Sequence, residues 1–482
     1  MSLENPANLA LINDFASVFV LNFAIAFYLI TALQWYAYKL SRVAFHFARF
    51  SWHAFFVFVP WFVYIFAPKF YLIYALVFQL PFLWLWHKKL DKKLVFTPKV
   101  KAFFAFLAFF TLTFAALGFA FGIRSNLAGL VFALIALKFF EIWQNHKFYK
   151  LAQQKLAQMP NLKVILITAS YGKTSIKNFL SQILAEKFSV YHTPRSVNTL
   201  LGIVADINQN LSQSTQIYIA EAGARQKGDI LAITRLLNPQ ICIIGEIGSA
   251  HLEYFKSVEN IRATKLEALQ SARLEQAFLH SSTLQAENAQ CQIYDKALKS
   301  VSATLEGLEF VLELGGQDEK FRANLLGSFN AENLCACIAC AGFLGVDLKS
   351  IKSAVASIKG VEHRLQIIAK TPKFIIDDGF NGNFKGMSES YLLCKNYKGR
   401  RVLVTPGIVE VSAEQNKALC GIINSCFDFV IIIGELNSKT LSENITLPKL
   451  VLKDKNALVQ TLAEHTKSGD LILFSNDTPN FM

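Results

Sequence analysis

Uncharged apolar runs dominate the first third of the chain. A helix of about 20 residues without Asp, Glu, Lys or Arg is long enough to cross the ~30 Å hydrocarbon core of a bilayer. The pattern therefore predicts a transmembrane region of about five helices over residues 1–145, in which the fifth run is weaker because Lys138 and Glu141 interrupt it. The alternative is a buried, all-helical globular domain. The runs cover residues 15–38, 50–68, 70–86, 102–123 and 125–143.

Positive charge follows the first and third runs. Six lysines lie between Lys88 and Lys101, and such basic loops face the cytoplasm in membrane proteins. This asymmetry predicts that the N-terminus lies outside and that the chain after about residue 145 is cytoplasmic. Most of the formal net charge of +13 belongs to this region, so we expect no nucleic-acid partner.

Short β-type runs alternate with amphipathic stretches of helix length from residue 161 onwards. This alternation is typical of α/β domains, in which helices cover both faces of a parallel sheet. We expect two such domains, 161–360 and the smaller 361–482, after a polar linker or helix at 146–160. The predicted strands cover residues 164–168, 216–221, 240–245, 374–377, 401–405, 427–434 and 470–474.

All eight cysteines lie in this second part of the chain, scattered through apolar runs. A disulfide scaffold is typical of much smaller secreted domains, so we expect reduced thiols. Cys335, Cys337 and Cys340 are close enough in sequence to suggest a metal cluster. Helical spacing places Cys335 on a different face from the other two, which favours buried core thiols.

The β-type run at 164–168 leads into a short loop that ends in Gly172-Lys173-Thr174 and then opens a helix-like segment. Backbone N–H groups at a helix N-terminus attract phosphate, a lysine adds positive charge, and a hydroxyl can reach Mg²⁺. A chance Gly-Lys-Thr sequence is the alternative for this loop taken alone. The predicted phosphate site comprises Ser170, Gly172, Lys173, Thr174 and Ser175.

Further motifs follow the loop and resemble those of the Mur ligase family in order and spacing. The loop is similar to the family's G-[TS]-x-G-K-[ST], with Ala169 in place of the first glycine. Residues 221–230 resemble E-x-G-x-x-x-x-G-[DE]-I, and residues 377–383 resemble D-D-x-[YF]-N-x-N. Further residues that match family motifs are Asn198, Thr199, His251, Lys265, Asn330, Asn333 and Arg364.

The resemblance implies a Mur-ligase fold with a Rossmann-like last domain and an ATP-dependent, ADP-forming carboxylate–amine ligase. Two Mg²⁺ ions are implied, one held by Thr174 and Glu221, the other by His251 and a carbamylated Lys265. The resemblance implies an acyl-phosphate intermediate formed from the acceptor carboxylate. The implied catalytic residues are Lys173, His251, Lys265 and Arg364.

The same resemblance assigns nucleotide and substrate contacts. The amides of Asn330 and Asn333 would meet the adenine of ATP, Asp378 would bind the ribose, and Arg364 would approach the phosphates. The implied substrate residues are Asn198, Thr199, Asn381 and Asn383.

The segments at 198–202, 363–365 and 377–387 are most similar to the branch of the family that adds D-Ala-D-Ala to UDP-N-acetylmuramoyl-tripeptide in peptidoglycan synthesis. We therefore expect a multi-pass protein of the bacterial inner membrane that contacts lipid and, as further candidate partners, membrane proteins of cell-wall synthesis. The family's uridine-binding domain is not visible, and the apolar runs occupy its place. A lipid-linked or other peptide acceptor is thus an alternative, and an ATPase that energises its own helices is a third interpretation.

Overall fold

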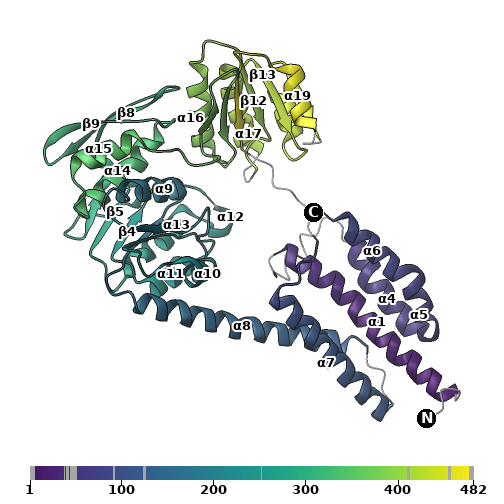
Figure 1. The fold of residues 1–482 in the computed structure, drawn as a ribbon. Coiled ribbons are helices and arrows are strands. Elements are labelled where there is room, and N and C mark those ends of the chain that lie inside the picture. The colour runs from purple at the N-terminus through teal and green to yellow at the C-terminus, as the bar shows by residue number, and fades with distance from the viewer. Residues whose placement is uncertain are drawn as a thin grey trace. The chain divides into compact units, whose positions relative to one another are not determined.

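The structure is a computed structural model of the chain. It divides into two compact units, the first extending to Lys147 and the second beginning at Phe148 (Figure 1). The residues that it describes are 6–36, 38, 43, 51–90, 93–122, 126–250, 252–380, 382–409, 413–453 and 457–476.

The described part of the first unit is helical. Its central helix is α1, because 67% of the apolar stretch of α1 is buried, against 22–28% in the other long helices. The helices are α1 (Pro6–Trp35), α3 (Ser51–His53), η1 (Ala54–Phe58), α4 (Val59–Phe66), η2 (Pro68–Phe70), α5 (Tyr71–Tyr74), η3 (Ala75–Gln79), α6 (Leu80–Lys89), α7 (Pro98–Phe121) and α8 (Ala128–Ala157).

Four helical stretches among the described residues are long and apolar enough to cross a membrane. The predicted run at 50–68 forms a shorter apolar helix, Ser51–Phe66. It ends there because the residue before a proline disfavours helical geometry, and Ala67, which precedes Pro68, has φ −136° and ψ 55°. The four long stretches are Ile12–Trp35, Pro68–Lys89, Pro98–Phe121 and Ala128–Ala157.

The prolines at positions 60 and 81 each follow a π-helical segment. η1 ends just before Val59-Pro60, and η3 ends just before Leu80-Pro81. A proline removes one backbone donor and its ring displaces the carbonyl four residues earlier, and a wider π turn accommodates both effects. The helices therefore continue through both prolines.

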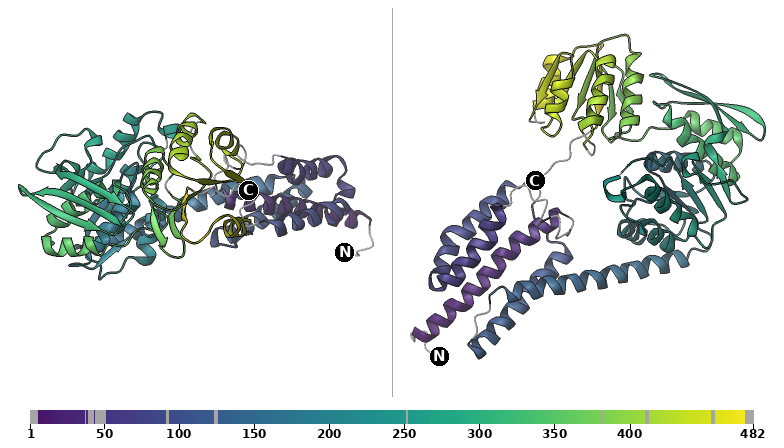
Figure 2. Two further views of the ribbon diagram at one scale, coloured as in Figure 1. Left: turned by 90° about the horizontal axis from the view of Figure 1, so that it is seen from above. Right: turned by 180° about the vertical axis from the view of Figure 1, so that it is seen from behind.

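The weak fifth run forms α8, which continues without a break to Ala157 (Figure 2). The carboxylate of Glu141 lies 3.4 Å from the ammonium of Lys99 and 3.5 Å from that of Lys138, so the charges that interrupt the run form an ion-paired group. Residues 146–157 are thus helical rather than an irregular linker.

The second unit begins with a six-stranded parallel sheet of order β2-β3-β1-β4-β5-β6. One face packs against α9, α14 and α15, and the other against α10, α11, α13 and the end of α8. The strands are β1 (Lys163–Thr168), β2 (Val190–His192), β3 (Ile217–Glu221), β4 (Ile241–Ile244), β5 (Gln276–Leu279) and β6 (Cys291–Ile293).

Alternating residues of each strand explain these two cores. In β1, Ile165 and Ile167 face the first core, whereas Val164 and Leu166 face the second, and all four are fully or almost fully buried. The helices of this part are α9 (Lys173–Leu184), α10 (Leu200–Asn210), α11 (Asp229–Leu237), α12 (Leu252–Phe255), α13 (Val258–Leu266), η4 (Glu267–Gln270), η5 (Ser281–Thr283), η6 (Tyr294–Ala297), α14 (Phe329–Phe343) and α15 (Leu348–Ala356).

The last part of the chain forms a second six-stranded sheet of order β10-β11-β15-β12-β13-β14, in which only β10 is antiparallel to its neighbour. The helices α16, α17 and α18 pack on one face and α19 on the other. These elements are β10 (Gln366–Ala369), β11 (Phe374–Asp378), α16 (Phe384–Lys395), β12 (Arg401–Thr405), α17 (Ala413–Cys426), β13 (Phe429–Ile433), α18 (Ser438–Asn444), β14 (Lys449–Leu452), α19 (Leu458–His465) and β15 (Leu471–Ser475).

All seven predicted strands are present, and both large sheets are α/β layers as predicted. The sequence did not reveal a three-stranded antiparallel sheet, which lies between the two large sheets along the chain. Its strands are β7 (Leu298–Thr304), β8 (Gly307–Leu314) and β9 (Gln317–Ala323). The domain boundary at residue 360 stays a prediction.

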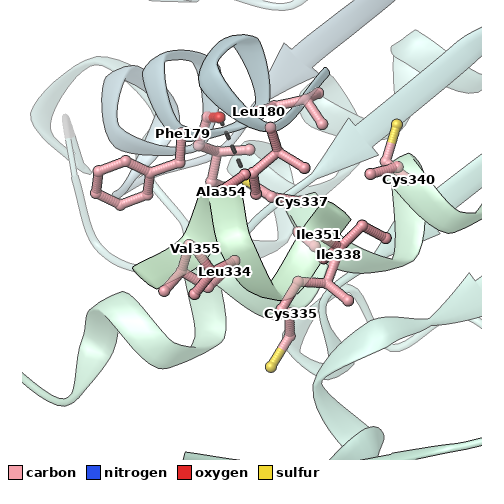
Figure 3. Packing of buried hydrophobic residues seen from close by; sticks show 14 of the residues in the cluster. Phe179, Leu180, Leu334, Cys335, Cys337, Ile338, Cys340, Ile351, Ala354 and Val355 are labelled. Carbon is pink, nitrogen blue, oxygen red and sulfur yellow. Dashed lines mark hydrogen bonds between the residues drawn. The ribbon is translucent and has the colours of Figure 1, made fainter. Parts of the chain in front are cut away.

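The three neighbouring cysteines of α14 lie in the first core, between α9 and α15, and their sulfur atoms point in different directions (Figure 3). Cys337 is directed at α9, where its thiol lies 3.4 Å from the carbonyl oxygen of Ile176. All three side chains are at most 2% exposed. The prediction of buried core thiols is confirmed, and burial raises the pKa of each thiol.

Candidate active site

The carboxyl end of β1 is the natural place for a ligand in this sheet. β1 lies between β3 and β4, and the chain leaves it for the edge strand β2 before returning through β3. Loops diverge at such a switch point and leave room for a ligand beyond the strand ends. The register pairs Ile167 with Glu221, so the last residue of β3 lies beside the loop that follows β1.

The loop after β1 has the backbone that a phosphate site needs. Gly172 caps α9 with φ +77°, a conformation that side chains disfavour. A Cβ atom at this position would lie 2.4 Å from the Oδ1 atom of Asn333, so a side chain here would displace the Asn333 amide. The bare N-terminus of α9 therefore faces the loop with its backbone N–H groups available to an anion.

Ala169, which departs from the family pattern, is accommodated without strain. Its φ is not positive, and its methyl group is fully buried. Gly245, at the end of β4, lies opposite: a Cβ atom there would come within 3.0 Å of the Ala169 methyl group. The missing side chain at 245 thus provides the space that the extra methyl at 169 requires.

Lys173 bends back over this loop. Its ammonium donates to the carbonyl oxygens of Ala169 at 2.8 Å and Ser170 at 3.1 Å. Burial lowers the pKa of Lys173 to about 8, with Glu221 opposing this shift and Arg364 adding to it. An incoming phosphate would provide the strong counter-charge that neutral carbonyls lack.

Glu221 is the buried carboxylate around which the site is organised. It is 1% exposed, and its Oε2 atom accepts the hydroxyl of Thr174 at 3.0 Å. Its Oε1 atom accepts the amide of Asn198 at 3.0 Å. A carboxylate and a hydroxyl in contact are oxygen ligands of the kind that Mg²⁺ prefers, so the residues present fit the ion that the family implies.

Lys265 is a second buried amine near the loop. It is 4% exposed, and burial, followed by the charge of Lys173, lowers its pKa to about 7, while nearby carboxylates oppose the shift. The neutral form of an amine is the one that reacts with CO₂ to give a carbamate. The lowered pKa of Lys265 gives it a substantial neutral fraction near pH 7.

Arg364 reaches the phosphate loop from the connection to the second sheet. Its Nη2 atom lies 3.4 Å from the hydroxyl of Thr174. The residues on either side, His363 and Leu365, have positive φ angles of 60° and 51°. Asp378 is 1% exposed and accepts the backbone N–H of Leu365 at 2.9 Å, which holds the arginine segment against the end of β11.

Two asparagines at the start of α14 form a pair. The Asn333 amide donates to Asn330 at 3.1 Å, and Asn330 donates to the carbonyl of Leu326 at 2.8 Å. Asn333 faces Gly172, so the pair lies beside the phosphate loop. Ser175, in the first turn of α9, is also buried.

Three of the predicted substrate residues are described, and two of these cap helices. The Thr199 hydroxyl accepts from Gly202 at the start of α10, and Asn383 accepts from Gly386 at the start of α16. Their roles toward a substrate stay predictions. His251 and Asn381, predicted as a metal ligand and a substrate residue, lie outside the described residues.

The sequence did not single out several residues that hold the site together. Lys177, which is fully buried, lies 3.3 Å from Glu221, and burial lowers its pKa. Glu267 accepts the N–H groups of Gly228 and Leu231 at 2.8 and 3.0 Å and so closes the turn into α11. Lys177 lies on the same apolar face of α9 as Leu180 and Leu184. A lysine at such a position in the helical pattern indicates a buried charge.

Comparisons with known proteins show which proteins this chain resembles. The sequence model of the family "Mur ligase middle domain" matches residues 167–341 of this chain. The UDP-N-acetylmuramoyl-tripeptide–D-alanyl-D-alanine ligase of Bacillus subtilis is 27% identical over 336 residues, which cover 65% of this chain and 72% of that protein. The enzyme of the same name from Escherichia coli K12 is 26% identical, and the match covers 55% of this chain and 62% of that protein.

Solved structures show the same fold. A crystal structure of MurF from Acinetobacter baumannii superposes with a TM-score of 0.63 and 24% identity, covering 69% of this chain and 78% of that one. MurF from Thermotoga maritima in complex with ADP gives a TM-score of 0.60 at 23% identity, covering 69% and 80%.

Proposed function

Because this chain belongs to the Mur ligase family of ATP-dependent, ADP-forming amide ligases, we propose that it joins D-Ala-D-Ala to UDP-N-acetylmuramoyl-tripeptide in peptidoglycan precursor synthesis. The names of the relatives from B. subtilis and E. coli support these substrates. The observation that carries the proposal is the gathering of Lys173, Thr174, Glu221 and Arg364 at the carboxyl end of β1.

The proposed reaction has two steps. An oxygen of the tripeptide's terminal carboxylate attacks the γ-phosphorus of ATP, and the bond to the β-phosphate oxygen breaks, which releases ADP. The amine of D-Ala-D-Ala then attacks the carbonyl carbon of the acyl phosphate. The bond to the phosphate oxygen breaks, inorganic phosphate leaves with the electron pair, and the amine nitrogen loses a proton. Catalysis of this kind depends on positioning and on stabilising charge.

Each gathered residue has a role in the first step. Lys173 and the N–H groups at the start of α9 would neutralise the phosphates, and Arg364 would stabilise the charge that develops on the transferred group. Mg²⁺ bound by Thr174 and Glu221 would supply further positive charge to the phosphate oxygens. The roles of Asn330 and Asn333 toward adenine and of Asp378 toward ribose complete the proposal.

A second candidate acceptor is a lipid-linked peptidoglycan precursor. The four long apolar helices before the ligase part favour it, since a bilayer would bring such a substrate to the same surface. The reaction and its residues would be unchanged, and only the carrier of the tripeptide would differ.

One assay tests the function and its alternative. The full-length protein, purified in detergent, receives ATP, Mg²⁺, UDP-N-acetylmuramoyl-tripeptide and D-Ala-D-Ala. We expect the pentapeptide product and one phosphate for each amide bond formed. Product formed only from the lipid-linked tripeptide would favour the second acceptor. Phosphate release that does not depend on any acceptor would overturn the ligase proposal.

Carbamylation of Lys265 gives a pH-dependent prediction. Because its pKa is lowered to about 7, the amine is mostly protonated at pH 6 and mostly neutral at pH 8. Activity of CO₂-depleted enzyme should therefore be restored by bicarbonate much faster at pH 8 than at pH 6. Lys265→Ala should lose about 10²-fold in activity, by the usual cost of removing a ligand-site group, and regain part of it with acetate.

The matched control for this experiment is Lys256→Ala, which removes a lysine from the preceding turn. Its activity should not respond to bicarbonate or acetate. Recovery by Lys265→Ala equal to that of the wild type with bicarbonate alone would contradict the carbamate.

We further propose that the first unit spans the inner membrane and that the ligase part lies in the cytoplasm. Its helices expose large apolar side chains to the outside, among them Phe66, Phe119, Phe121 and Phe139, each at least 66% exposed. Soluble monomers rarely expose such extended apolar surface. Lys88 lies 5.3 Å from the ring of Trp84 and Lys147 lies 5.5 Å from that of Trp143, an arrangement suited to a lipid–water interface.

The proposed orientation does not depend on the shorter helix. Only Ala67 separates the Ser51–Phe66 helix from the stretch that begins at Pro68, so these two ends lie at one depth. The two helical stretches on either side of Ala67 form a hairpin. If both span the bilayer, or if both enter only part of it, the chain after Lys89 lies on the same side of the membrane as the chain before Ser51. α1, α7 and α8 then make three crossings, and the basic loops put the end of the third in the cytoplasm.

Insertion is tested with a charge on a lipid-facing position. Leu112, on α7, is 50% exposed, and Leu112→Arg should destabilise the inserted state by about 2.5–3.5 kcal/mol. The measurement is the fraction of protein that stays in the membrane pellet after alkaline carbonate extraction, which should be nearly complete for the wild type and lower for the variant. The control is Leu436→Arg, at a 60% exposed position of the second unit. Full release of the wild-type protein would contradict membrane insertion.

A further inference from the structure

Lys177 is a lysine in a place where lysines are rare. Its side chain is completely buried, and it lies on α9 one turn after Lys173 and Thr174. Burying an ammonium group is costly unless it gains an opposite charge and further hydrogen bonds. The contacts that offset this cost therefore indicate what the residue is for.

The ammonium of Lys177 joins two segments that are distant in sequence. It lies 3.3 Å from the Oε2 atom of Glu221, at the end of β3, and it donates a hydrogen bond to the carbonyl of Arg195. Arg195 has a positive φ of 46°, which is uncommon for a residue with a side chain. Lys177 thus supports an unusual backbone turn as well as a buried carboxylate.

The turn that Lys177 supports also contacts Glu221. The Thr193 hydroxyl accepts the backbone N–H of Glu221 at 3.1 Å, and the Asn198 amide binds the Oε1 atom of the carboxylate. The carbonyl of Asn198 accepts the N–H of Gly223 at 2.7 Å, two residues after Glu221. Residues 193–198 therefore surround the end of β3, and the hydrogen bond from Lys177 to the carbonyl of Arg195 connects this turn to α9.

The outcome is a carboxylate with fixed orientation. Thr174, Lys177 and Asn198 hold its two oxygens from α9 and from the turn, and the Glu221 side chain is only 1% exposed. Groups that hydrogen-bond to a metal-ligand residue and fix its orientation also determine metal affinity. Their removal typically lowers that affinity by about 10-fold to 100-fold.

We infer that Lys177 is a positioning residue of the nucleotide site: it fixes the orientation of the Glu221 carboxylate so that a divalent cation finds a preformed ligand. The inference rests on the proposed function, in which Glu221 takes Mg²⁺. Lys177 has no direct contact with substrate in this role, because it is fully enclosed behind the carboxylate. Its removal should therefore change how much Mg²⁺ the site needs rather than the chemistry of the transferred group.

The experiment measures nucleotide binding as a function of Mg²⁺. The full-length protein in detergent is titrated with the ATP analogue AMP-PNP by calorimetry at a series of Mg²⁺ concentrations. Lys177→Met should raise the Mg²⁺ concentration needed for half-maximal binding by about 10-fold to 100-fold. Lys177→Arg, which keeps the charge, should recover part of the wild-type response.

Lys187→Met is the matched control. The Lys187 ammonium also binds a backbone carbonyl, that of Gly345 at 2.6 Å, but its side chain is exposed and lies away from Glu221. This variant should keep the wild-type Mg²⁺ response. If Lys177→Met does not yield folded protein, Lys177→Gln keeps a donor without the charge and should show the same increase in Mg²⁺ requirement.

The outcomes separate the inference from the proposed function. A Lys177→Met or Lys177→Gln protein with an unchanged or lower Mg²⁺ requirement would overturn the positioning role and leave the ligase proposal intact. Wild-type protein whose AMP-PNP binding does not respond to Mg²⁺ at all would count against the metal site of the proposed function itself.

Discussion

Lys173→Ala is expected to abolish amide synthesis, lowering kcat/KM by about 10³-fold or more. The ammonium of Lys173 lies over the loop at the start of α9, and no other residue of that loop is cationic. Its loss removes the compact charge that would neutralise the phosphates of ATP while leaving the backbone of the cradle unchanged. The measurement is pentapeptide formation with coupled phosphate release under saturating substrates.

Lys187→Ala is the control for this variant, because it removes an exposed lysine just beyond the end of α9. It should retain wild-type kinetics. Thermal unfolding of the two variants should be similar, since the Lys173 ammonium contacts only backbone carbonyls of its own loop among the described residues. A Lys173→Ala protein that still forms the amide bond at the wild-type rate would refute the phosphate-loop assignment.

The second large effect is expected for Arg364→Ala. Its guanidinium lies 3.4 Å from the Thr174 hydroxyl, close to where the γ-phosphate of ATP would bind. If it stabilises charge mainly in the transition state, kcat should fall by about 10³-fold while the affinity for ADP changes little. Steady-state kinetics and ADP titration calorimetry measure the two quantities separately.

Arg400→Ala provides the comparison for Arg364. Arg400 belongs to the same part of the chain, but it binds Asp470 and the carbonyl of His465 at the far end of the second sheet. It should keep its kcat and lose at most some stability. Equal losses of ADP affinity and of kcat in Arg364→Ala would instead indicate that the arginine binds the nucleotide in the ground state.

The positions of seven strands and of the phosphate loop along the chain were predictable because they depend on local pattern. Buried parallel strands are continuous apolar runs, and all seven that were predicted from such runs are present. The site residues that emerged from motifs, such as Glu221 and Arg364, lie where the ends of β3 and of the connecting segment meet the loop.

The elements that escaped prediction lack such patterns. β2 and β6 have three residues each. β7 has no buried residue, and β8 and β9 combine a few buried positions with several charged residues, so all three resemble surface loop. Lys177 and Glu267 escaped because their roles come from partners 18 to 44 residues away in sequence, and no local rule relates those segments. Gly245 likewise has meaning only beside the methyl of Ala169.

The placement of the eight thiols makes them natural reporters of local opening. Seven are buried, and none belongs to the first 241 residues. A slow alkylating reagent would modify a core thiol only when its surroundings open, so the rate at each cysteine follows the free energy of that opening. Cys337 and Cys340 report on the layer beneath the phosphate loop, and Cys394 and Cys420 report on the last sheet. Mass spectrometry of the wild-type chain therefore measures the alkylation rates of these two layers separately. The apolar helices contain no cysteine and contribute no alkylated peptide.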